Sequence, residues 1–400
     1  MSARNDLPDT AAKWKSEYKS LAWKSIHEYG LACSGSEISR EQFLLLRTLW
    51  VEHDAEELYA RDRSLWIDDS SFKEAQQFLS SSAIALIWKQ FLKSTRIHPH
   101  DLEREGYVDL HTFSLVRYHQ AQSQDLRSEV NDSAKVDMSP IAKRTRFQQR
   151  LRLEAQSSPT PAPKLSGLEQ QVKNLSLSNS TPDQPPTTPD RGSSLSQSRS
   201  LGDIPSPFED PKVFKAIQDE QIVNTALIEY LNALAIHCTQ LQANWTLHRL
   251  PLIARDHHTT KTYEARVDGY LRRRRDNMPL AIIEVKPFVR KTKQVQIRMQ
   301  ESAQMAAWIN QHRPLSTSQP GGTNNKIKRL LISQDRHRIY LNFASFDTNY
   351  VDYICDKQGI DHNAVSFLTM HEYGPFDVGD ETDMSMLGEL VLGYALSKGK

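Results

Sequence analysis

Residues 208–400 predict an α/β fold, because segments with the helical period of 3.6 residues alternate with segments that have the strand period of 2. An amphipathic stretch at 214–238 predicts the first helix, 294–310 the second and 384–397 the last. Three strand-like segments separate the first two helices, and two more follow the second. The predicted order is helix, three strands, helix, two strands, helix.

Each predicted strand is bounded by turn residues or polar residues. The third strand is a short apolar run interrupted by two charged residues. The last two strands flank the polar residues 333–336 and predict a hairpin. The expected strands lie at 245–254, 262–271, 280–289, 329–332 and 338–343.

Residues 1–120 predict a separate, small all-α module. Ser39 and Gln42 have the spacing of a capping box, so a helix is expected to begin at Ser39 and to continue through Trp50. A second helical pattern covers 70–93. The module has 15 basic and 18 acidic residues, which gives no electrostatic signal for phosphate binding. We expect its helices to contact a protein partner.

Residues 121–207 predict a disordered linker. The part from 148 to 207 contains no aromatic residue and 9 of the 19 prolines, so it cannot bury enough apolar surface to fold. A basic cluster at 143–146 precedes it. Such a cluster suits nuclear import or contact with phosphates, and a solvated helix end explains it equally well. Because the cluster suits nuclear import, we favour the nucleus over the cytoplasm as the location of the protein.

Composition excludes several classes of protein. The apolar runs are much shorter than the roughly 20 residues that a membrane-spanning helix needs, so no membrane association is expected. The N-terminus has no apolar segment typical of a secretory signal. Three cysteines, far apart, predict no disulfide and indicate a reducing compartment. The formal net charge of +1 averages over regions of unlike charge.

Two charged residues interrupt the apolar strand at 280–289, and they indicate chemistry. Glu284 and Lys286 are two residues apart, so a strand places both side chains on one face. Asp268 lies on the preceding strand, next to Gly269, and an antiparallel pairing brings it opposite Glu284. Two carboxylates form a site suited to Mg²⁺ or Mn²⁺, and Lys286 could position or deprotonate a water molecule there. A buried salt-bridge network would show the same pattern.

These residues resemble the PD-(D/E)XK nuclease superfamily, in particular its fungal nuclease-like branch. The resemblance covers about 208–400 and rests on Glu264-Ala-Arg-Val-Asp-Gly-Tyr270, Ile282-Ile-Glu-Val-Lys-Pro287 and the helix at 300–309. It implies a restriction-endonuclease-like core, with Asp268 and Glu284 as metal ligands and Lys286 as the motif lysine. Val267 stands where the motif nominally has proline.

The resemblance adds two further candidate catalytic residues. Gln304 with Trp308 is similar to the Gln-x-x-x-aromatic signature of RecB-like members, and Glu220 matches an accessory acidic position on the first helix. Glu220 shares a helical face with Leu227 and Leu231, so we expect it to face the site. Structural hydrogen bonding for Gln304 and a capping or solvated role for Glu220 remain alternatives.

Basic residues concentrate around the expected site. Residues 271–298 contain nine basic and two acidic side chains, a net charge of +7. Such residues could hold a nucleic-acid backbone without reading bases, and a solvated turn is the alternative. The candidate nucleic-acid contacts are Arg272, Arg273, Arg274, Arg275, Arg290, Lys291 and Lys293.

The sequence therefore predicts a metal-dependent nuclease that hydrolyses phosphodiester bonds, with DNA favoured over RNA as its substrate. The alternative is a noncatalytic nucleic-acid-binding or protein-interaction protein that retains the nuclease fold. A purely structural scaffold is a third, weaker reading.

Overall fold

The computed structural model of the chain describes residues 6–21, 25–29, 33–98, 101, 107–125, 211–314, 326–357 and 365–399. Residues 1–130 and 215–400 form one compact unit. The predicted linker, apart from residues 121–125, and the basic cluster at 143–146 lie outside the described residues.

The core of this unit is a mixed sheet of seven strands in the order β2-β10-β9-β8-β7-β6-β3. The pairs β2/β10 and β7/β8 are parallel, and the other neighbours are antiparallel. The fold is therefore mixed α/β. The strands are β2 (Thr48–His53), β3 (Ala243–Thr246), β6 (Gly269–Arg273), β7 (Pro279–Lys286), β8 (Ile327–Asp335), β9 (Arg338–Phe346) and β10 (Leu368–Asp377).

A second sheet of three strands has the order β1-β5-β4. It consists of β1 (Cys33–Ser34), β4 (Pro251–Arg255) and β5 (Lys261–Arg266). The stretch expected to be one strand at 245–254 thus divides between two sheets. Residues 247–250 connect the two strands, and one of them, Arg249, becomes important below.

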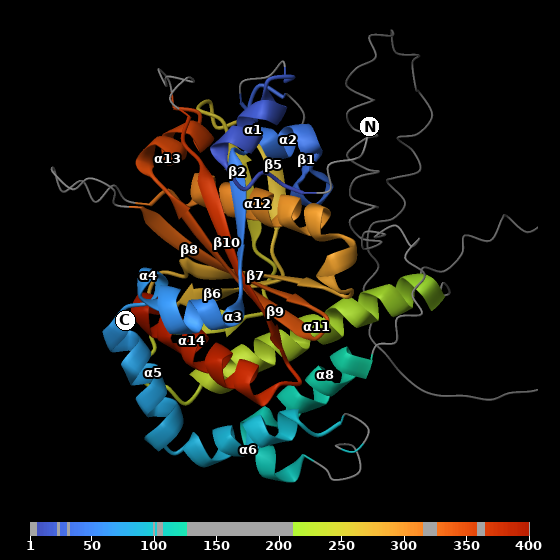
Figure 1. Cartoon of the computed structure of the whole chain (residues 1–400), viewed down its shortest axis with the longest axis vertical. Coiled ribbons are helices and arrows are strands. Elements are labelled where there is room, and N and C mark those ends of the chain that lie inside the picture. Colours follow the sequence, from blue (N-terminus) through green and yellow to red (C-terminus); the bar gives the residue numbers. More distant parts are fainter. Residues whose placement is uncertain are drawn as a thin grey trace, which may run out of the picture. The chain divides into compact units, whose positions relative to one another are not determined.

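Helices cover both faces of the large sheet (Figure 1). One face is covered by α12 (Gln294–Gln311), with α1 (Ala11–Tyr18), α2 (Arg40–Leu45) and α13 (Thr348–Ile354) beside it. The other face packs against α11, α14, α5, α6 and α8, which span Pro211–Ala235, Glu381–Gly399, Asp69–Ser81, Ala85–Thr95 and Ser114–Asp125. Short helical turns complete the chain: η1 (Gly35–Glu37), α3 (Ala55–Glu57), η2 (Leu58–Asp62), α4 (Arg63–Trp66), η3 (Val108–Phe113) and η5 (Arg290–Thr292).

Strand β7 shows how the sequence divides the core into two layers. Ile283 and Val285 are buried against the α11 and α14 face, whereas Ile282 is buried with α12 on the other. Successive side chains of a strand point to opposite faces, so Glu284 and Lys286 lie on the same side as Ile282. The two charged residues therefore face helix α12.

The N-terminal region is not the separate all-α module expected over 1–120. Strand β2 pairs in parallel with β10, and Trp50 Nε1 donates a hydrogen bond to Ser302 Oγ on α12 at 2.9 Å. Both hydrophobic cores combine residues from the N-terminal and C-terminal regions. Leu46, Leu49 and Trp50 have helical spacing, but Leu46 is the C-cap of α2, and the other two lie on β2, whose partner strand β10 is more than 300 residues away. Helix α8 also passes the expected boundary and ends at Asp125.

The capping box expected at Ser39 is confirmed, whereas the helices of this region are shorter than expected. Helix α2 has Ser39 as its N-cap, with the reciprocal capping-box bonds to Gln42 both present. It ends at Leu45, before β2 begins. The pattern at 70–93 forms two helices, α5 and α6, because Ser82 adopts an extended conformation between them.

The C-terminal prediction was right in outline and incomplete in detail. Helices α11, α12 and α14 and the β8–β9 hairpin are present. Helix α13 and strand β10 were not expected. Burial in β10 alternates from Leu368 to Glu372, but one of the buried positions is the charged Glu372, and a bulge between Tyr373 and Phe376 then breaks the period of 2.

The sequence predicts no membrane-spanning helix and no disulfide, and the described residues bear on both predictions. None of their helices combines the length and apolar character needed to cross a bilayer. Cys238 and Cys355 are buried and form no disulfide among the described residues.

Candidate active site

The β6–β7 hairpin places Asp268 beside Glu284. The main-chain nitrogen of Asp268 donates to Ile283 O at 2.9 Å, and Asp268 Oδ2 accepts from Val285 N at 3.1 Å. The strands are antiparallel neighbours, as the sequence predicted. Gly269 is required here, because a Cβ atom at this position would lie 2.7 Å from Thr246 O. The absence of a side chain lets β3 approach the strand that carries Asp268.

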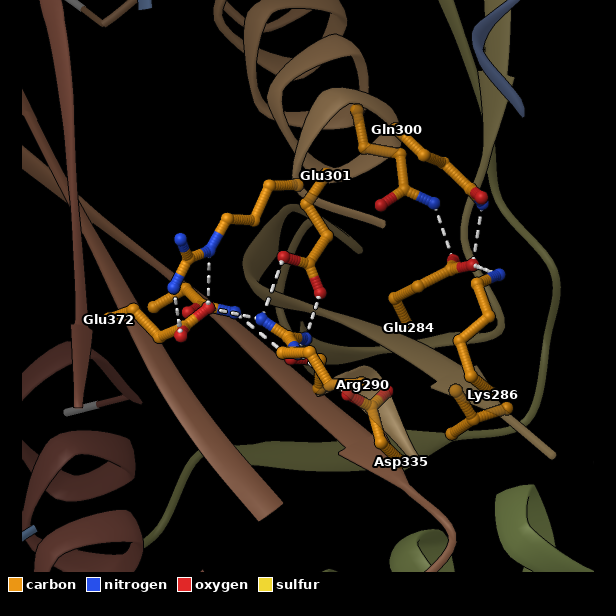
Figure 2. Close-up of polar contacts among 12 residues, drawn as sticks. Glu284, Lys286, Arg290, Gln300, Glu301, Asp335 and Glu372 are labelled. Carbon is orange, nitrogen blue, oxygen red and sulfur yellow. Dashed lines mark hydrogen bonds and ion pairs between the residues drawn. The ribbon is translucent and has the colours of Figure 1, made fainter. Parts of the chain in front are cut away.

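Glu284 is almost fully buried, with 3% of its side chain exposed. Three side chains donate to its carboxylate (Figure 2): Lys286 and Gln300 to Oε1, the latter at 2.6 Å, and Gln304 to Oε2. Burial raises the pKa of Glu284 to about 8, and the charge of Asp268 adds to this effect while Lys286 opposes it. Three hydrogen bonds therefore fix the orientation of the Glu284 carboxylate, but they do not fully offset the cost of burying its charge.

Lys286 is held as an ammonium ion in this arrangement. Burial by itself would lower its pKa, but the carboxylates of Glu284, Asp268 and Glu220 outweigh that effect and raise the pKa of Lys286 above its ordinary value. Its side chain is 13% exposed. In this state Lys286 can donate hydrogen bonds and supply positive charge, and it cannot accept a proton.

Arg249 bridges the other two carboxylates. Its Nη2 atom lies 2.5 Å from Asp268 Oδ1 and 3.2 Å from Glu220 Oε1, and its Nε atom also donates to Asp268 Oδ1 at 3.1 Å. Burial raises the pKa of Glu220, with a further contribution from Asp268. We call Glu220, Asp268, Glu284, Lys286 and Arg249 the acidic site.

The structure brings together all five candidate catalytic residues of the sequence analysis. Asp268, Glu284 and Lys286 come from the hairpin, Glu220 from α11 and Gln304 from α12. Gln304 Nε2 also donates to Arg266 O at 2.8 Å, so this side chain links α12 to the segment before Asp268. Glu220 lies near Asp268, and Arg249 bridges the two carboxylates.

Three residues of the site were missed. Gln300 lies one helical turn before Gln304 and therefore on the same face, a signal that was present in the sequence. Asn224 lies one turn after Glu220 on α11, and its Nδ2 donates to Asp268 O at 3.2 Å. Arg249 belongs to an irregular connection, and no local pattern marks it.

The donor set fits a hard divalent cation. Asp268 and Glu284 provide carboxylate oxygens, the ligands that Mg²⁺ and Mn²⁺ prefer. Two residues that contact the hairpin residues, Asn224 and Gln304, each have an amide oxygen that is buried without a hydrogen-bond partner among the described residues. Three carboxyl groups, Glu220, Asp268 and Glu284, share this site with two cations, Lys286 and Arg249. Burial is the main cause of the raised pKa values of Glu220 and Glu284, and the charge of Asp268 adds to it.

A second group of buried charges lies on the same side of the sheet. Arg290 donates to Asp335 Oδ2 and to Glu301 Oε1, each at 2.6 Å, and also to Glu372. Arg298 Nη2 donates to Glu372 Oε1 at 2.6 Å. We call Arg290, Arg298, Glu301, Asp335 and Glu372 the Arg290 cluster. Figure 2 shows that Gln300 points toward Glu284, whereas its neighbour Glu301 points toward Arg290.

Arg290 was predicted to contact nucleic acid, and this prediction is wrong because the side chain is buried within the Arg290 cluster. The side chain of Arg290 is 2% exposed, and three carboxylates bind it. A guanidinium that is buried and paired in this way cannot reach a phosphate in solution. The basic character of the segment at 286–293 is therefore carried at the surface by Lys291, which is exposed, and Lys293, which is partly exposed.

Residues 272–275, which we call the basic turn, are not at the mouth of the acidic site, contrary to the expectation. Asp268 precedes β6 and Glu284 is near the end of β7, whereas the turn lies at the other end of the hairpin. Five residues of strand separate Asp268 from Arg273, roughly 16 Å. Arg273 pairs with Asp276 at 2.7 Å and Arg272 is partly buried, which leaves Arg274 and Arg275 as the exposed cations of this turn.

A further set of possible ligand atoms occurs at the end of β2. His53, Glu57 and Asp62 bring three such atoms within 4.8 Å of one another. His53 Nδ1 lies 3.3 Å from Glu57 Oε2, and Tyr373 Oη donates to Asp62 at 2.8 Å. These side chains therefore already contact neighbouring groups of the fold.

Comparisons of the chain with models of known families, with curated proteins and with solved structures find no significant match. The fold and the site by themselves define a mixed α/β protein with a buried group of carboxylates around a lysine.

Proposed function

We propose that this protein is a metal-dependent nuclease of the PD-(D/E)XK type, which hydrolyses phosphodiester bonds of nucleic acid. The observation that carries the proposal is the meeting of Asp268, Glu284 and Lys286 on adjacent antiparallel strands, with Gln304 bonded to Glu284. Charged groups are costly to bury, and a hydrolytic site of this kind needs that combination.

Asp268 and Glu284 would hold Mg²⁺ or Mn²⁺. Such an ion, when bound, neutralises charge on a phosphate group and lowers the pKa of water. Gln300 and Gln304 orient the Glu284 carboxylate through the hydrogen bonds described above, and Glu220 adds negative charge beside Asp268. These residues build a rigid oxygen-rich site on strands and helices.

Lys286 has the role of positioning the attacking water and of stabilising negative charge on phosphorus. Its raised pKa supports this role over that of a general base, because a base must be unprotonated to accept a proton. The exposed cations Arg274, Arg275 and Lys291 are candidates for contact with the nucleic-acid backbone. DNA in the nucleus is the favoured substrate.

The test compares wild type with Glu284→Gln on single-stranded, duplex and branched DNA and on RNA, with Mg²⁺ or Mn²⁺ at pH 8. Glu264→Gln is the matched control, because Glu264 pairs with Lys261 and Arg266 outside the acidic site. We expect metal-dependent cleavage that falls by about 10²–10⁴-fold in Glu284→Gln and persists in the control.

Cleavage that survives in Glu284→Gln, or that wild type never shows, would sink the catalytic proposal. If wild type then binds nucleic acid without cleaving it, the noncatalytic binding protein is the better description.

A further inference from the structure

Arg249 is the one member of the acidic site that is largely in contact with solvent. Its side chain is 55% exposed, compared with 37% for Glu220, 6% for Asp268 and 3% for Glu284. Arg249 belongs to the connection between β3 and β4, so no regular element fixes its main chain. A long side chain anchored outside the site can leave it without disturbing the sheet.

Its guanidinium occupies the position of a bridging cation. Arg249 Nη2 contacts Asp268 Oδ1 and Glu220 Oε1 at 2.5 and 3.2 Å, so one charged group joins the carboxylate of the hairpin to that of α11. Asp268 Oδ1 receives both Nη2 and Nε of Arg249, while Oδ2 is taken by Val285 N. Both oxygens of Asp268 are therefore in use while Arg249 is in place.

A divalent cation cannot bind Asp268 Oδ1 while two N–H groups of a guanidinium point at that oxygen. Positive charges also repel each other strongly at such short range. By contrast, Lys286 contacts Glu284 and not Asp268, so the ammonium does not compete for the same oxygen.

We propose that Arg249 is an exchangeable internal cation that closes the acidic site and that a divalent metal ion must displace from Asp268 and Glu220 in order to bind. This inference rests on the proposed metal-dependent function and adds a step of regulation to it. The closed form stabilises the carboxylates in the absence of metal and lowers the apparent metal affinity, because each binding event must first break the Arg249 contacts.

The experiment is a calorimetric titration with Mn²⁺ of the full chain, as wild type, Arg249→Gln and Arg249→Lys. Arg266→Gln is the matched control, because Arg266 is also exposed and paired with a carboxylate, Glu264, outside the site. We expect Arg249→Gln to bind Mn²⁺ about 10–100-fold more tightly than wild type, the equivalent of losing one charged hydrogen-bond contact. Arg249→Lys should lie between them, and Arg266→Gln should match wild type.

A second measurement uses wild type alone and does not depend on a variant folding. The Arg249 Nε–Hε signal in a nitrogen-proton NMR spectrum should move on addition of Mg²⁺, while that of Arg266 should not. Equal Mn²⁺ affinity in wild type and Arg249→Gln, together with an Arg249 signal that does not move, overturns the exchange and leaves the metal site standing. No Mn²⁺ binding in any form of the protein overturns both the exchange and the proposed nuclease.

Discussion

The acidic site and the Arg290 cluster both contain buried carboxyl groups, and the negative charge of these groups is balanced differently in the two places. In the Arg290 cluster, one guanidinium with 2% exposure holds three carboxylates. In the acidic site, Lys286 forms an ion pair with Glu284, while Asp268 and Glu220 form ion pairs with Arg249, whose side chain is 55% exposed. The first group is locked by internal partners, and the second relies on a cation that solvent can reach.

This difference separates a structural ion network from a site that can exchange its cation. Burial of charge alone does not identify a functional site, since both groups are buried and both contain a carboxyl whose pKa is raised. The informative property is how the negative charge is balanced and by which side chain. Helix α12 supports both groups, with Gln300 facing one and Glu301 the other (Figure 2).

The largest effect is expected from Arg290→Met. It would leave Glu301, Asp335 and Glu372 buried without their common cation, and breaking a buried pair costs about 3–5 kcal/mol. Denaturant unfolding would measure the loss in the free energy of unfolding. Glu284→Gln is the comparison in the acidic site. Its expected loss is smaller, about 1–2 kcal/mol, because the amide oxygen still accepts a hydrogen bond from Gln304 and because Asp268 and Glu220 also stabilise the charge of Lys286. Equal losses in the two variants would abolish the distinction drawn here.

An intermediate effect is expected from Glu301→Gln, and it depends on pH. Burial raises the pKa of Glu301 from 4.5 to about 7, against the opposing charge of Arg290. Between these values the folded protein binds more protons than the unfolded chain, so the free energy of unfolding falls as pH rises through this range. The change is on the order of 3 kcal/mol, because each pKa unit corresponds to about 1.4 kcal/mol. Unfolding measured between pH 4.5 and 8 should show this slope in wild type, and Glu301→Gln should have a smaller one; identical slopes would contradict the assignment.

The smallest effect is expected from Arg275→Ala. The side chain is 71% exposed and lies 3.7 Å from Asp276, so the free energy of unfolding should change by less than about 0.5 kcal/mol. Mn²⁺ affinity should be unchanged, because the basic turn is at the far end of the hairpin from Asp268. Binding to duplex DNA should weaken slightly, and the slope of its salt dependence should decrease by about 1. A change in Mn²⁺ affinity would show that the turn and the acidic site are coupled.

Much of the acidic site could be predicted from the spacing of its residues along the sequence. Glu284 and Lys286 share a face because they are two residues apart on a strand, and Glu220 and Gln304 occupy predictable faces of their helices. Gln300 follows the same rule. Arg249 could not be found in this way, because an irregular connection has no period and its contacts with Asp268 and Glu220 are made only after three elements come together.

The sequence by itself determined the alternation of helices and strands in 208–400, the capping box at Ser39 and the strand that carries Glu284 and Lys286. Tertiary structure decided that β2 joins the large sheet, that Arg290 is buried and that the basic turn lies away from Asp268. The physical reason is the distance along the chain over which each interaction acts. Periodicity and capping act over a few residues, whereas strand pairing and burial depend on partners that lie tens or hundreds of residues away.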